Sequence, residues 1–552
     1  MADFKNKVVY QIYPKSFNDA DGDGVGDLRG VIEKLDYLAG LGVDYLWLTP
    51  FFVSPQKDNG YDVADYCAID PRFGTMADFD ELVKSAAAKN LKIMLDMVLC
   101  HTSDQHEWFK RALAGDEEYQ RYYILRDGRN KKSAADPGEP PTNWQCAFGG
   151  SAWEWSPRLN KWYLHLHDVS QPDLDWTNPK VREELAAVVR FWKERGVAGF
   201  RFDVINMISK PEVFADDTEN LGRRLFADGP HVHEYLRELV QKAGIEGMIT
   251  VGEMASTDLD NCLRYTRPDA HELSMVFSFH HLKVDYKNGD KWALTEPNIT
   301  ELKRLFADWQ TGMAKAGGCN ALFWCNHDQP RIVSRFGNDK NYRVASAKML
   351  ATCIHLMRGV PYIYQGEEIG MTNAGYTTID EYRDVESLNY YKILTEQGKT
   401  NAEALAILAA RSRDNGRTPM QWSAEKYAGF STHEPWIPLA DNYADINVAA
   451  AQADENSLLA FYKQLIRLRH EMPIIAEGDI RFIENDNPDV IAYERTWQNE
   501  RLTVFCNFRN TSAKLQNVAL NDFTGWQKLL CNYAGSENIL RPYEVVVFYR
   551  KK

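Results

Sequence analysis

The chain has 552 residues, a length that predicts one large domain with smaller attached parts rather than a single small core. Its apolar share of 44% and charged share of 26% are ordinary for a globular protein. The formal net charge of −14 argues against nucleic acid as a general partner, because a phosphate backbone attracts a basic surface.

The cysteines give no sign of a disulfide framework. There are nine, an odd number, and none stands in a CxxC pair, so a zinc site is not predicted either. The first residues, MADFKNKVVYQIYP, lack the apolar region of a signal peptide, and no apolar run approaches the length needed to span a membrane. We therefore expect a reduced, cytoplasmic protein without a membrane partner.

Eight short runs of β-branched or aromatic residues recur along the chain, separated by segments with helical periodicity such as Asp78–Lys89 and Val181–Arg195. This alternation predicts an α/β protein with a (β/α)₈ barrel. The predicted strands are Val8–Tyr13, Val43–Leu48, Ile93–Val98, Gly199–Asp203, Met248–Gly252, Ser274–Phe277, Ala321–Cys325 and Tyr362–Gln365.

Two stretches exceed the usual spacing between strands. The gap after the third predicted strand is the longest, and its middle, Arg126–Gly150, is rich in Gly, Pro, Asn and Lys. Such a composition is typical of loops, so we predict an inserted, loop-rich domain there. A second excess follows the eighth strand, at about 371–448, and carries a predicted helical hairpin near Asp380–Arg411.

Beyond Pro473 the pattern changes to alternating runs with turn residues and no helical periodicity, which predicts a C-terminal antiparallel β domain. Its predicted strands are Ile480–Glu484, Val490–Trp497, Leu502–Asn507 and Val545–Tyr549. The predicted division of the chain is 1–101 and 172–476 for the barrel, 102–171 for the inserted domain and 477–552 for the C-terminal domain.

The fourth predicted strand, GFRFDV, carries two charges inside an apolar run. Its alternation places Arg201 and Asp203 on one face. Opposite charges on a buried strand are costly unless they pair or take part in chemistry. The hexamer alone is compatible with a structural ion pair or with a catalytic group.

Other predicted strands also end in ionisable side chains. Strand five supplies Glu253 and strand seven leads to Asp328, while His101 follows strand three. Active sites of (β/α)₈ barrels gather at the C-terminal ends of the strands. Burying so many ionisable groups in a purely structural core would be unfavourable, so the pattern favours a functional site.

Three carboxylates suit the hydrolysis of an acetal. One attacks the anomeric carbon and a second protonates the leaving oxygen, and retaining enzymes hold these two about 5–5.5 Å apart. Asp203 and Glu253 lie on consecutive predicted strands, which is compatible with that spacing. Arg201 would keep Asp203 ionised, and Glu253 would need a raised pKa to carry a proton near neutrality.

A family resemblance extends over essentially the whole chain. The sequence resembles the oligo-1,6-glucosidase-like branch of the α-amylase clan of glycoside hydrolases. The motifs that carry the resemblance are QIYPKSF, NGYDVADY, DMVLCHTS, QPDLDW, GFRFDV, VGEM, NHDQPR and GVPYIYQGEEIGM. It implies that Asp203 is the nucleophile, Glu253 the acid/base, and Asp328 the third carboxylate, which grips sugar hydroxyls.

The resemblance also implies a pocket for the non-reducing glucose, closed at its floor by a contact between Asp62 and Arg417. A closed floor implies exo action on short substrates. Val204, directly after the nucleophile, is similar to members that do not cut internal α-1,4 chains. The implied pocket residues are Tyr61, Asp62, His101, Arg201, His327 and Arg417.

The chain departs from the family pattern at three positions. Cys100 stands where Asn is usual, and a thiol hydrogen-bonds only weakly. His167 stands where an aromatic is commoner, and Asp175 where Asn is usual. We expect the leaving-group subsite to differ accordingly.

A metal site is predicted near the N-terminus, in DADGDGVGD. Carboxylates at alternate positions, Gly at the sixth place and a carbonyl at the seventh match the start of a calcium loop. Gly30 occupies the twelfth place, where a bidentate Glu is expected, so an ordinary Asp/Gly turn is the alternative. No cofactor is expected for catalysis, and the ligands of a structural Ca²⁺ or Mg²⁺ would be Asp19, Asp21, Asp23, Val25 and Asp27.

The segment after the sixth strand, FHHLKVDYKNGDKW, is basic in an acidic protein. It is either a solvated loop or, since it leaves the face where the leaving group must lie, a site for an anion such as a sugar phosphate. Lys283 and Lys291 are our candidates for binding phosphate, and Arg223 and Arg224 rank below them.

The same segment is similar to that of the trehalose-6-phosphate hydrolases. This resemblance implies that a small phosphorylated disaccharide, α,α-trehalose 6-phosphate, is hydrolysed to glucose and glucose 6-phosphate. The alternatives are an oligo-1,6-glucosidase, a trehalose or sucrose isomerase-type transglycosylase, and a non-catalytic amylase-like subunit of an amino-acid transporter.

Overall fold

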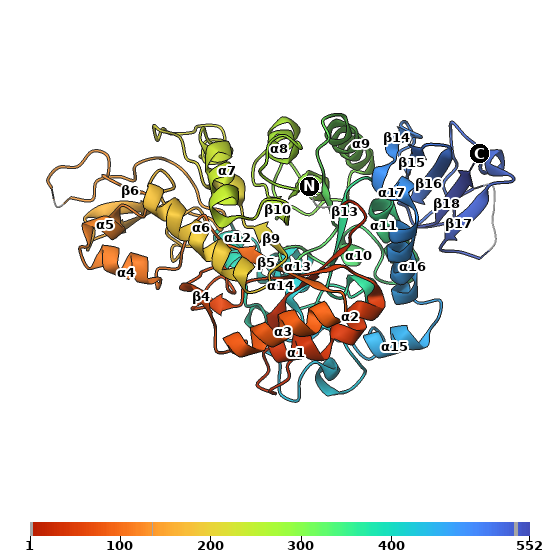
Figure 1. Ribbon diagram of the computed structural model, residues 1–552, viewed down its shortest axis with the longest axis horizontal. Helices are drawn as coiled ribbons and strands as arrows, with labels where there is room; N and C mark the ends of the chain where they lie inside the picture. The colour runs from red at the N-terminus through yellow and green to blue at the C-terminus, as the bar shows by residue number, and fades with distance from the viewer. Residues whose placement is uncertain (1–3, 135, 535–538, 552) are drawn as a thin grey trace.

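The computed structural model describes residues 4–134, 136–534 and 539–551, and its centre is an eight-stranded parallel sheet (Figure 1). The strand order is β11-β10-β9-β5-β2-β1-β13-β12, and a parallel bridge between Val276 and Asn320 joins the two outer strands into a barrel. The predicted (β/α)₈ barrel is therefore confirmed. Its strands are β1 (Val9–Ile12), β2 (Tyr45–Leu48), β5 (Lys92–Met97), β9 (Gly199–Phe202), β10 (Ile249–Glu253), β11 (Met275–Phe277), β12 (Ala321–Leu322) and β13 (Val360–Tyr364).

Helices with one apolar face surround the barrel, as the periodicity predicts. α3 begins after a Thr75–Asp78 capping box and buries Phe79 and Leu82, while α6 begins after Asn178 with a proline in its first turn. The barrel-layer helices are α1 (Leu28–Glu33), α2 (Leu35–Leu41), α3 (Met76–Ala88), α6 (Pro179–Glu194), α7 (Val232–Ala243), α8 (Leu259–Thr266), α9 (Ile299–Lys315), α10 (Ile332–Arg335), α11 (Arg343–His355), α16 (Leu458–Glu471) and α17 (Pro473–Glu477).

Aromatic side chains from three different strands meet inside the barrel. The ring centroids of Trp47 and Phe277 are 5.5 Å apart, and Phe277 lies 4.7 Å from Tyr362. The indole N–H of Trp47 donates to Asp96 at 3.2 Å. This apolar layer fills the barrel and forms a rigid floor below the polar strand ends.

The segment between β5 and β9 leaves the barrel and forms a small unit of its own, in orange in Figure 1. It returns to the barrel at backbone bridges between His101 and Asp173 and between Tyr123 and Leu174. Besides loops it contains α4 (Glu107–Leu113), α5 (Glu117–Gln120) and a three-stranded sheet of β6 (Leu125–Arg126), β8 (Lys161–Leu164) and β7 (Trp153–Ser156). A two-stranded pair, β3 (Phe52–Val53) and β4 (Asp65–Ile69), lies before it in the chain.

The chain after β13 forms the predicted helical hairpin, α12 (Val385–Glu396) and α13 (Asn401–Arg411). Thr400 and Glu403 form a capping box, in which each side chain accepts a hydrogen bond from the backbone amide of the other. This capping box explains why α13 begins directly after Thr400. The short helices α14 (Asp414–Arg417) and α15 (Val448–Ala453) follow.

The C-terminal domain is a five-stranded antiparallel sheet, in blue in Figure 1. The four predicted strands are present, and β17 is an addition that the sequence does not signal, because it is half exposed and bulged between Lys528 and Leu530. The strand order is β14 (Asp479–Ile483), β15 (Val490–Trp497), β16 (Glu500–Asn507), β18 (Val545–Lys551) and β17 (Gln527–Cys531). The outer ends of the predicted ranges 1–101 and 477–552 lie outside the described residues.

Within the described ranges, every helix is too short or too polar to cross a membrane.

Two buried carboxylates follow β13. Glu368 accepts hydrogen bonds from the Tyr10 and Tyr37 hydroxyls at 2.7 and 2.6 Å, and Glu367 accepts one from Tyr462 at 2.7 Å. Burial raises the pKa of Glu367 to about 8, and the neighbouring Glu368 adds to the rise. The folded protein therefore holds a proton on Glu367 that the unfolded chain releases near its ordinary pKa of about 4.3.

Glu367→Gln tests this proton directly. The folded state binds the extra proton between about pH 4.3 and 8, so this group makes the native protein less stable as pH rises through that window. We expect the melting temperature of the variant to exceed that of the native chain by a few degrees at pH 8, with the gap closing toward pH 5. Thermal unfolding followed by circular dichroism across this range measures it, with exposed Glu396→Gln as the control. Parallel melting curves for Glu367→Gln and the native chain at every pH would contradict the assignment.

Candidate active site

A single buried guanidinium brings three carboxylates together at the C-terminal ends of the strands. Arg201 on β9 is only 1% exposed, and its Nη1 donates to Asp96 and to Asp203, each at 2.6 Å. Its Nη2 donates to Glu253 on the neighbouring strand β10. The ion pair between Arg201 and Asp203 within GFRFDV is thus present. The same guanidinium also binds Glu253, so it contacts both carboxylates that the sequence proposes for catalysis.

The two carboxylates differ in their protonation. Burial raises the pKa of Glu253 to about 8, and the charges of Asp203 and Asp328 contribute to the rise. Burial also opposes the ionisation of Asp203, but Arg201 and His101 hold the pKa of that carboxyl below its ordinary value. Near neutrality the pair therefore consists of an ionised Asp203 and a protonated Glu253, the division of roles that acid–nucleophile catalysis requires.

The residue after Asp203 is held in an unusual backbone conformation. Val204 has φ of 33° and ψ of 41°, which is rare for a β-branched residue. The amide of Asp203 donates to the carbonyl of Met97 at 3.0 Å, so β5 and β9 stay paired up to this sharp turn. Strain of this kind is stored where the surrounding structure fixes a functional side chain.

Asp328 lies in the loop after β12 and stays ionised. Its carboxylate is 2.7 Å from Arg417 Nη2, 3.2 Å from Arg413 Nη1 and 2.9 Å from His327 Nε2. Burial opposes ionisation, but His327 and Arg413 hold the pKa of Asp328 well below its ordinary value. One quarter of its side chain remains exposed, so a ligand can reach it.

The predicted pocket residues Tyr61, His101 and His327 lie in the same cluster. The Tyr61 ring stacks on His327 with centroids 5.1 Å apart, and its hydroxyl donates to Asp96 at 2.8 Å. His101 Nε2 lies 3.1 Å from the carbonyl of Tyr61, and Gln11 hydrogen-bonds His327 at 2.8 Å. These contacts fix the orientation of both imidazoles beside the carboxylates.

The predicted contact between Asp62 and Arg417 is wrong. Asp62 accepts hydrogen bonds from the Ser54 hydroxyl and from the amides of Lys57 and Asp58, so it holds the turn before Tyr61. The Arg417 guanidinium forms ion pairs with Asp328 and with Asp384, and the Asp384 carboxylate lies 3.2 Å from Arg417 Nη1.

The ion pair between these two motifs is made instead by Asp58 and Arg413, at 3.2 Å. Gln171 supports it by donating to Asp58 at 3.1 Å, and Asp384 accepts from Arg413 at 2.6 Å. Sequence reasoning missed these residues. The motif DNGYD contains an Asp on each side of Asn-Gly-Tyr, and SRDNGR contains two arginines, Arg413 and Arg417, four residues apart. The sequence therefore does not show which Asp pairs with which Arg.

Of the three departures from the family pattern, Cys100 lies in a contact between the inserted domain and the loop after β9, His167 lies against His101, and Asp175 lies in a turn. Lys210 pairs with Asp173 at 2.8 Å, and Cys100 lies 3.6 Å from each of them. The His167 ring lies 4.9 Å from that of His101, and burial lowers the pKa of His167 to about 4, so it is neutral. Asp175 accepts from Thr177 in the turn before α6.

The basic segment after β11 ends beside the post-barrel hairpin. Lys291 pairs with Glu386 on α12 at 2.6 Å, and the Trp292 ring stacks on Tyr390 at 4.5 Å. Lys283 is exposed at the end of a short 3₁₀ turn, His280–Lys283, and has no ion pair within the described residues.

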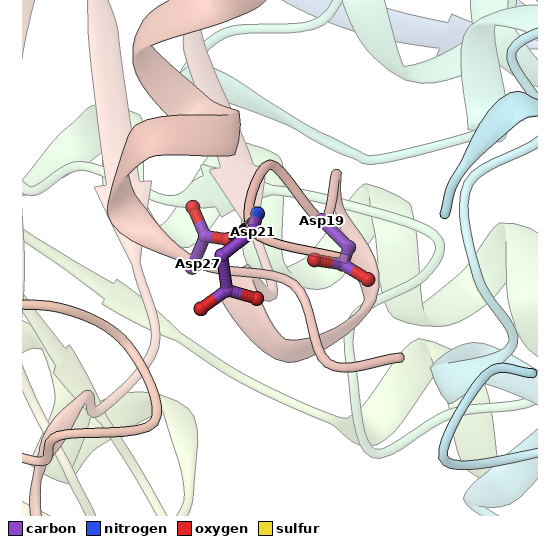
Figure 2. Close-up of side chains that lie close together, drawn as sticks. All are labelled: Asp19, Asp21 and Asp27. Carbon is purple, nitrogen blue, oxygen red and sulfur yellow. Dashed lines mark hydrogen bonds between the residues drawn. The ribbon is translucent and has the colours of Figure 1, made fainter. Parts of the chain in front are cut away.

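The N-terminal acidic loop gathers three of its five predicted ligands. Carboxylate oxygens of Asp19, Asp21 and Asp27 lie within 4.8 Å of one another. Figure 2 shows these three side chains close together in the loop. Burial and the neighbouring Asp23 raise the pKa of Asp21, which indicates repulsion that a cation would relieve. The Asp23 carboxylate lies outside this group and accepts from the amide of Val25 at 2.8 Å.

Comparisons with known proteins agree with this geometry. The family model described as Alpha amylase, catalytic domain matches residues 11–478, and that of the Maltogenic Amylase, C-terminal domain matches 480–530. Trehalose-6-phosphate hydrolase of Bacillus subtilis (strain 168) is 52% identical, over 99% of this chain and 98% of that protein. Oligo-1,6-glucosidase of Bacillus cereus is 45% identical, over 99% of each chain. A crystal structure of Bacillus licheniformis trehalose-6-phosphate hydrolase covers 100% of both chains with a TM-score of 0.95 and 49% identity.

Proposed function

We propose that this chain, which belongs to the alpha-amylase family, hydrolyses α,α-trehalose 6-phosphate to glucose and glucose 6-phosphate with retention of configuration. The chemistry rests on one observation, the pairing of an ionised Asp203 with a protonated Glu253 on the same guanidinium. The substrate rests on the 52% identity to a trehalose-6-phosphate hydrolase over nearly the full length of both chains.

The first step forms a covalent glucosyl-enzyme. A carboxylate oxygen of Asp203 attacks the anomeric carbon while Glu253 gives its proton to the glycosidic oxygen, and glucose 6-phosphate leaves. Asp328, ionised and open to the pocket, accepts hydrogen bonds from sugar hydroxyls and stabilises the positive charge that develops on the ring.

The second step releases glucose. Glu253, now ionised, takes a proton from water, and the water oxygen attacks the same carbon and displaces Asp203. Two displacements restore the original configuration. Arg201 holds both carboxylates throughout, and the pair of Asp58 and Arg413 bounds the glucose pocket, which favours removal of a terminal sugar.

The leaving group carries a phosphate, which the basic segment after β11 is suited to bind. Lys283 and Lys291 follow β11, the strand next to the one that carries Glu253. Each charge-assisted hydrogen bond to phosphate contributes about 1.5–3 kcal/mol. The positive charges of Lys283 and Lys291 would therefore favour a phosphorylated disaccharide over a neutral one.

We also propose that Asp19, Asp21 and Asp27 hold a structural divalent cation, since oxygen ligands suit Ca²⁺ and Mg²⁺. The ion would stabilise the loop before α1 and has no part in the chemical steps. We further infer a reducing, cytoplasmic setting, because all nine cysteines are free thiols.

Turnover of trehalose 6-phosphate and isomaltose at equal concentration tests the substrate. We expect the phosphorylated sugar to be cleaved at least tenfold faster, and faster cleavage of isomaltose would favour an oligo-1,6-glucosidase. Lys283→Ala should raise KM for trehalose 6-phosphate about 10- to 100-fold, the loss of one charge-assisted bond. It should leave a neutral aryl α-glucoside unaffected, and equal loss on both substrates would remove Lys283 from the phosphate site.

The pH profile tests the assignment of Glu253. Because Glu253 must be protonated in the first step, kcat/KM for trehalose 6-phosphate should fall as pH rises through about 8, where the substrate phosphate is already fully ionised. Glu253→Gln should lose about 10²–10⁴-fold on this substrate. With a nitrophenyl glucoside, whose leaving group needs no proton, the variant should still release an initial burst of nitrophenol. Normal turnover of trehalose 6-phosphate by Glu253→Gln would overturn the assignment.

Millimolar Ca²⁺ should raise the melting temperature by a few degrees after treatment with a chelator, because an ion bound only by the native state stabilises it. Asp21→Asn should abolish this response, whereas Asp269→Asn, a change at an exposed position on the barrel surface, should preserve it. An unchanged melting temperature in the native chain, or an equal response in both variants, would argue for an ordinary Asp/Gly turn.

A further inference from the structure

One buried asparagine joins the loop after the proposed nucleophile to the loop after the proposed acid/base. Asn206 lies three residues beyond Asp203, in the 3₁₀ turn Ile205–Met207, and its side chain is closed to solvent. Its Oδ1 accepts from the amide of Ala255 at 2.9 Å, and its Nδ2 donates to the carbonyl of Ala255 at 2.7 Å. This side chain therefore satisfies both backbone groups of a residue in the next loop, as a neighbouring strand would.

The orientation of the Asn206 amide follows from its partners. The N–H of Ala255 can only donate, so it must face the amide oxygen. The Ala255 carbonyl and a carboxylate oxygen of Asp228, 3.1 Å away, can only accept from the amide nitrogen. Both N–H donors of Asn206 are thus used, and a flipped amide would lose all three bonds.

Asp228 extends this network to the helix that follows β10. The oxygen that accepts from Asn206 also accepts from the Tyr265 hydroxyl at 2.6 Å, and the other oxygen accepts from Asn261 at 3.0 Å. Tyr265 and Asn261 both lie on α8. The amide of Asp228 donates to the carbonyl of Asn206 at 2.8 Å, so side chain and backbone hold the same turn. A fully bonded buried network of this kind is rigid.

The turn after β9 packs directly on β10 because residue 252 is glycine. A Cβ on Gly252 would come within 2.9 Å of Ile205, so a side chain there would have to displace the turn. Glu253 follows directly, at the end of β10, and the next amide, that of Met254, donates to Phe277 on β11 at 3.2 Å. The backbone that carries Glu253 is therefore held from the β11 side and from the β9 side.

We propose that Asn206 is a positioning residue that fixes Glu253 relative to Asp203. The inference rests on the proposed function, in which these two carboxyl groups act on one glycosidic bond, and names a residue that this function does not itself identify. Arg201 binds both carboxylates but restrains only side chains. Asn206 restrains the backbone beyond Glu253, and a displacement of about 1 Å at a reacting group costs about 100-fold in rate.

Asn206→Ala, Asn206→Asp and Asn487→Ala form the test set. Asn206→Ala removes both bonds to Ala255, whereas Asn206→Asp keeps the size of the side chain but cannot donate to the Ala255 carbonyl. Asn487, in the C-terminal domain, is the matched control. It is also buried, and its amide likewise donates to a carboxylate, Glu484 at 3.1 Å, and to a carbonyl, that of Lys514 at 2.8 Å.

We expect both Asn206 variants to lose about 100-fold on trehalose 6-phosphate, most of it in kcat. With a nitrophenyl α-glucoside, whose leaving group needs no proton, the initial burst of nitrophenol should stay close to the native rate. Steady-state turnover of this substrate should slow, because Glu253 must still activate water. Azide, a nucleophile that needs no general base, should then accelerate turnover by the Asn206 variants and not by the native chain. Asn487→Ala should melt a few degrees lower than the native chain but match its kinetics on both substrates.

The outcomes separate this inference from the proposed function. If the native chain hydrolyses trehalose 6-phosphate and the Asn206 variants match it, the role of Asn206 is overturned and the function stands. That role is equally overturned if the nitrophenol burst falls by the same factor as turnover of the phosphorylated sugar, or if Asn487→Ala loses as much activity, because either result indicates a general loss of structure. If the native chain prefers isomaltose, the proposed substrate fails, and the burst and the azide response still decide the role of Asn206. A native chain without α-glucosidase activity would overturn both.

Discussion

The active site depends on one buried positive charge shared by three carboxylates. Arg201 contacts Asp96, Asp203 and Glu253 in a space that is nearly closed to solvent. One guanidinium cannot compensate three negative charges at low dielectric, so protons must remain on part of the set. Burial raises the pKa of Asp96 to about 7 and that of Glu253 to about 8, while Asp203 keeps its charge. The difference between a protonated Glu253 and an ionised Asp203, on which the proposed mechanism rests, follows from this imbalance of charge.

The barrel supplies the geometry that this imbalance requires. Asp96, Arg201 and Glu253 lie on β5, β9 and β10, which are adjacent in the sheet. The register places Asp96 level with Arg201 and Arg201 level with Val251, so Glu253 lies two residues farther along β10 on the same face. The aromatic layer of Trp47, Phe277 and Tyr362 prevents the strand ends from collapsing inward, and the Trp47 indole anchors Asp96. A rigid floor and a fixed register keep side chains within the tolerance that catalysis needs.

The sequence predicts the barrel, the inserted domain, the hairpin and the main carboxylates, because each has a local signal. Short runs of β-branched and aromatic residues indicate the strands, and GFRFDV and NHDQPR mark strand ends. What it does not predict is which of two similar groups makes a long-range contact. Asp58 and Asp62 are four residues apart in one motif, and only the fold shows that Asp58 meets Arg413 while Asp62 holds its own turn. Half-exposed β17 escapes prediction because exposure and a bulge weaken its alternation.

The cations of the loops after β9 and β11 show the same limit. Composition treats Arg223, Arg224, Lys283 and Lys291 alike. In the part of the chain that the structure describes, Lys291 and Arg224 each have a glutamate within 4 Å, whereas Arg223 and Lys283 have no ion pair. At physiological ionic strength, charges beyond about 8 Å are largely screened, so the global charge of −14 has little effect at these loops. Under the proposed function, unpaired charges close to the leaving group would therefore matter more for phosphate binding than the net charge of the chain.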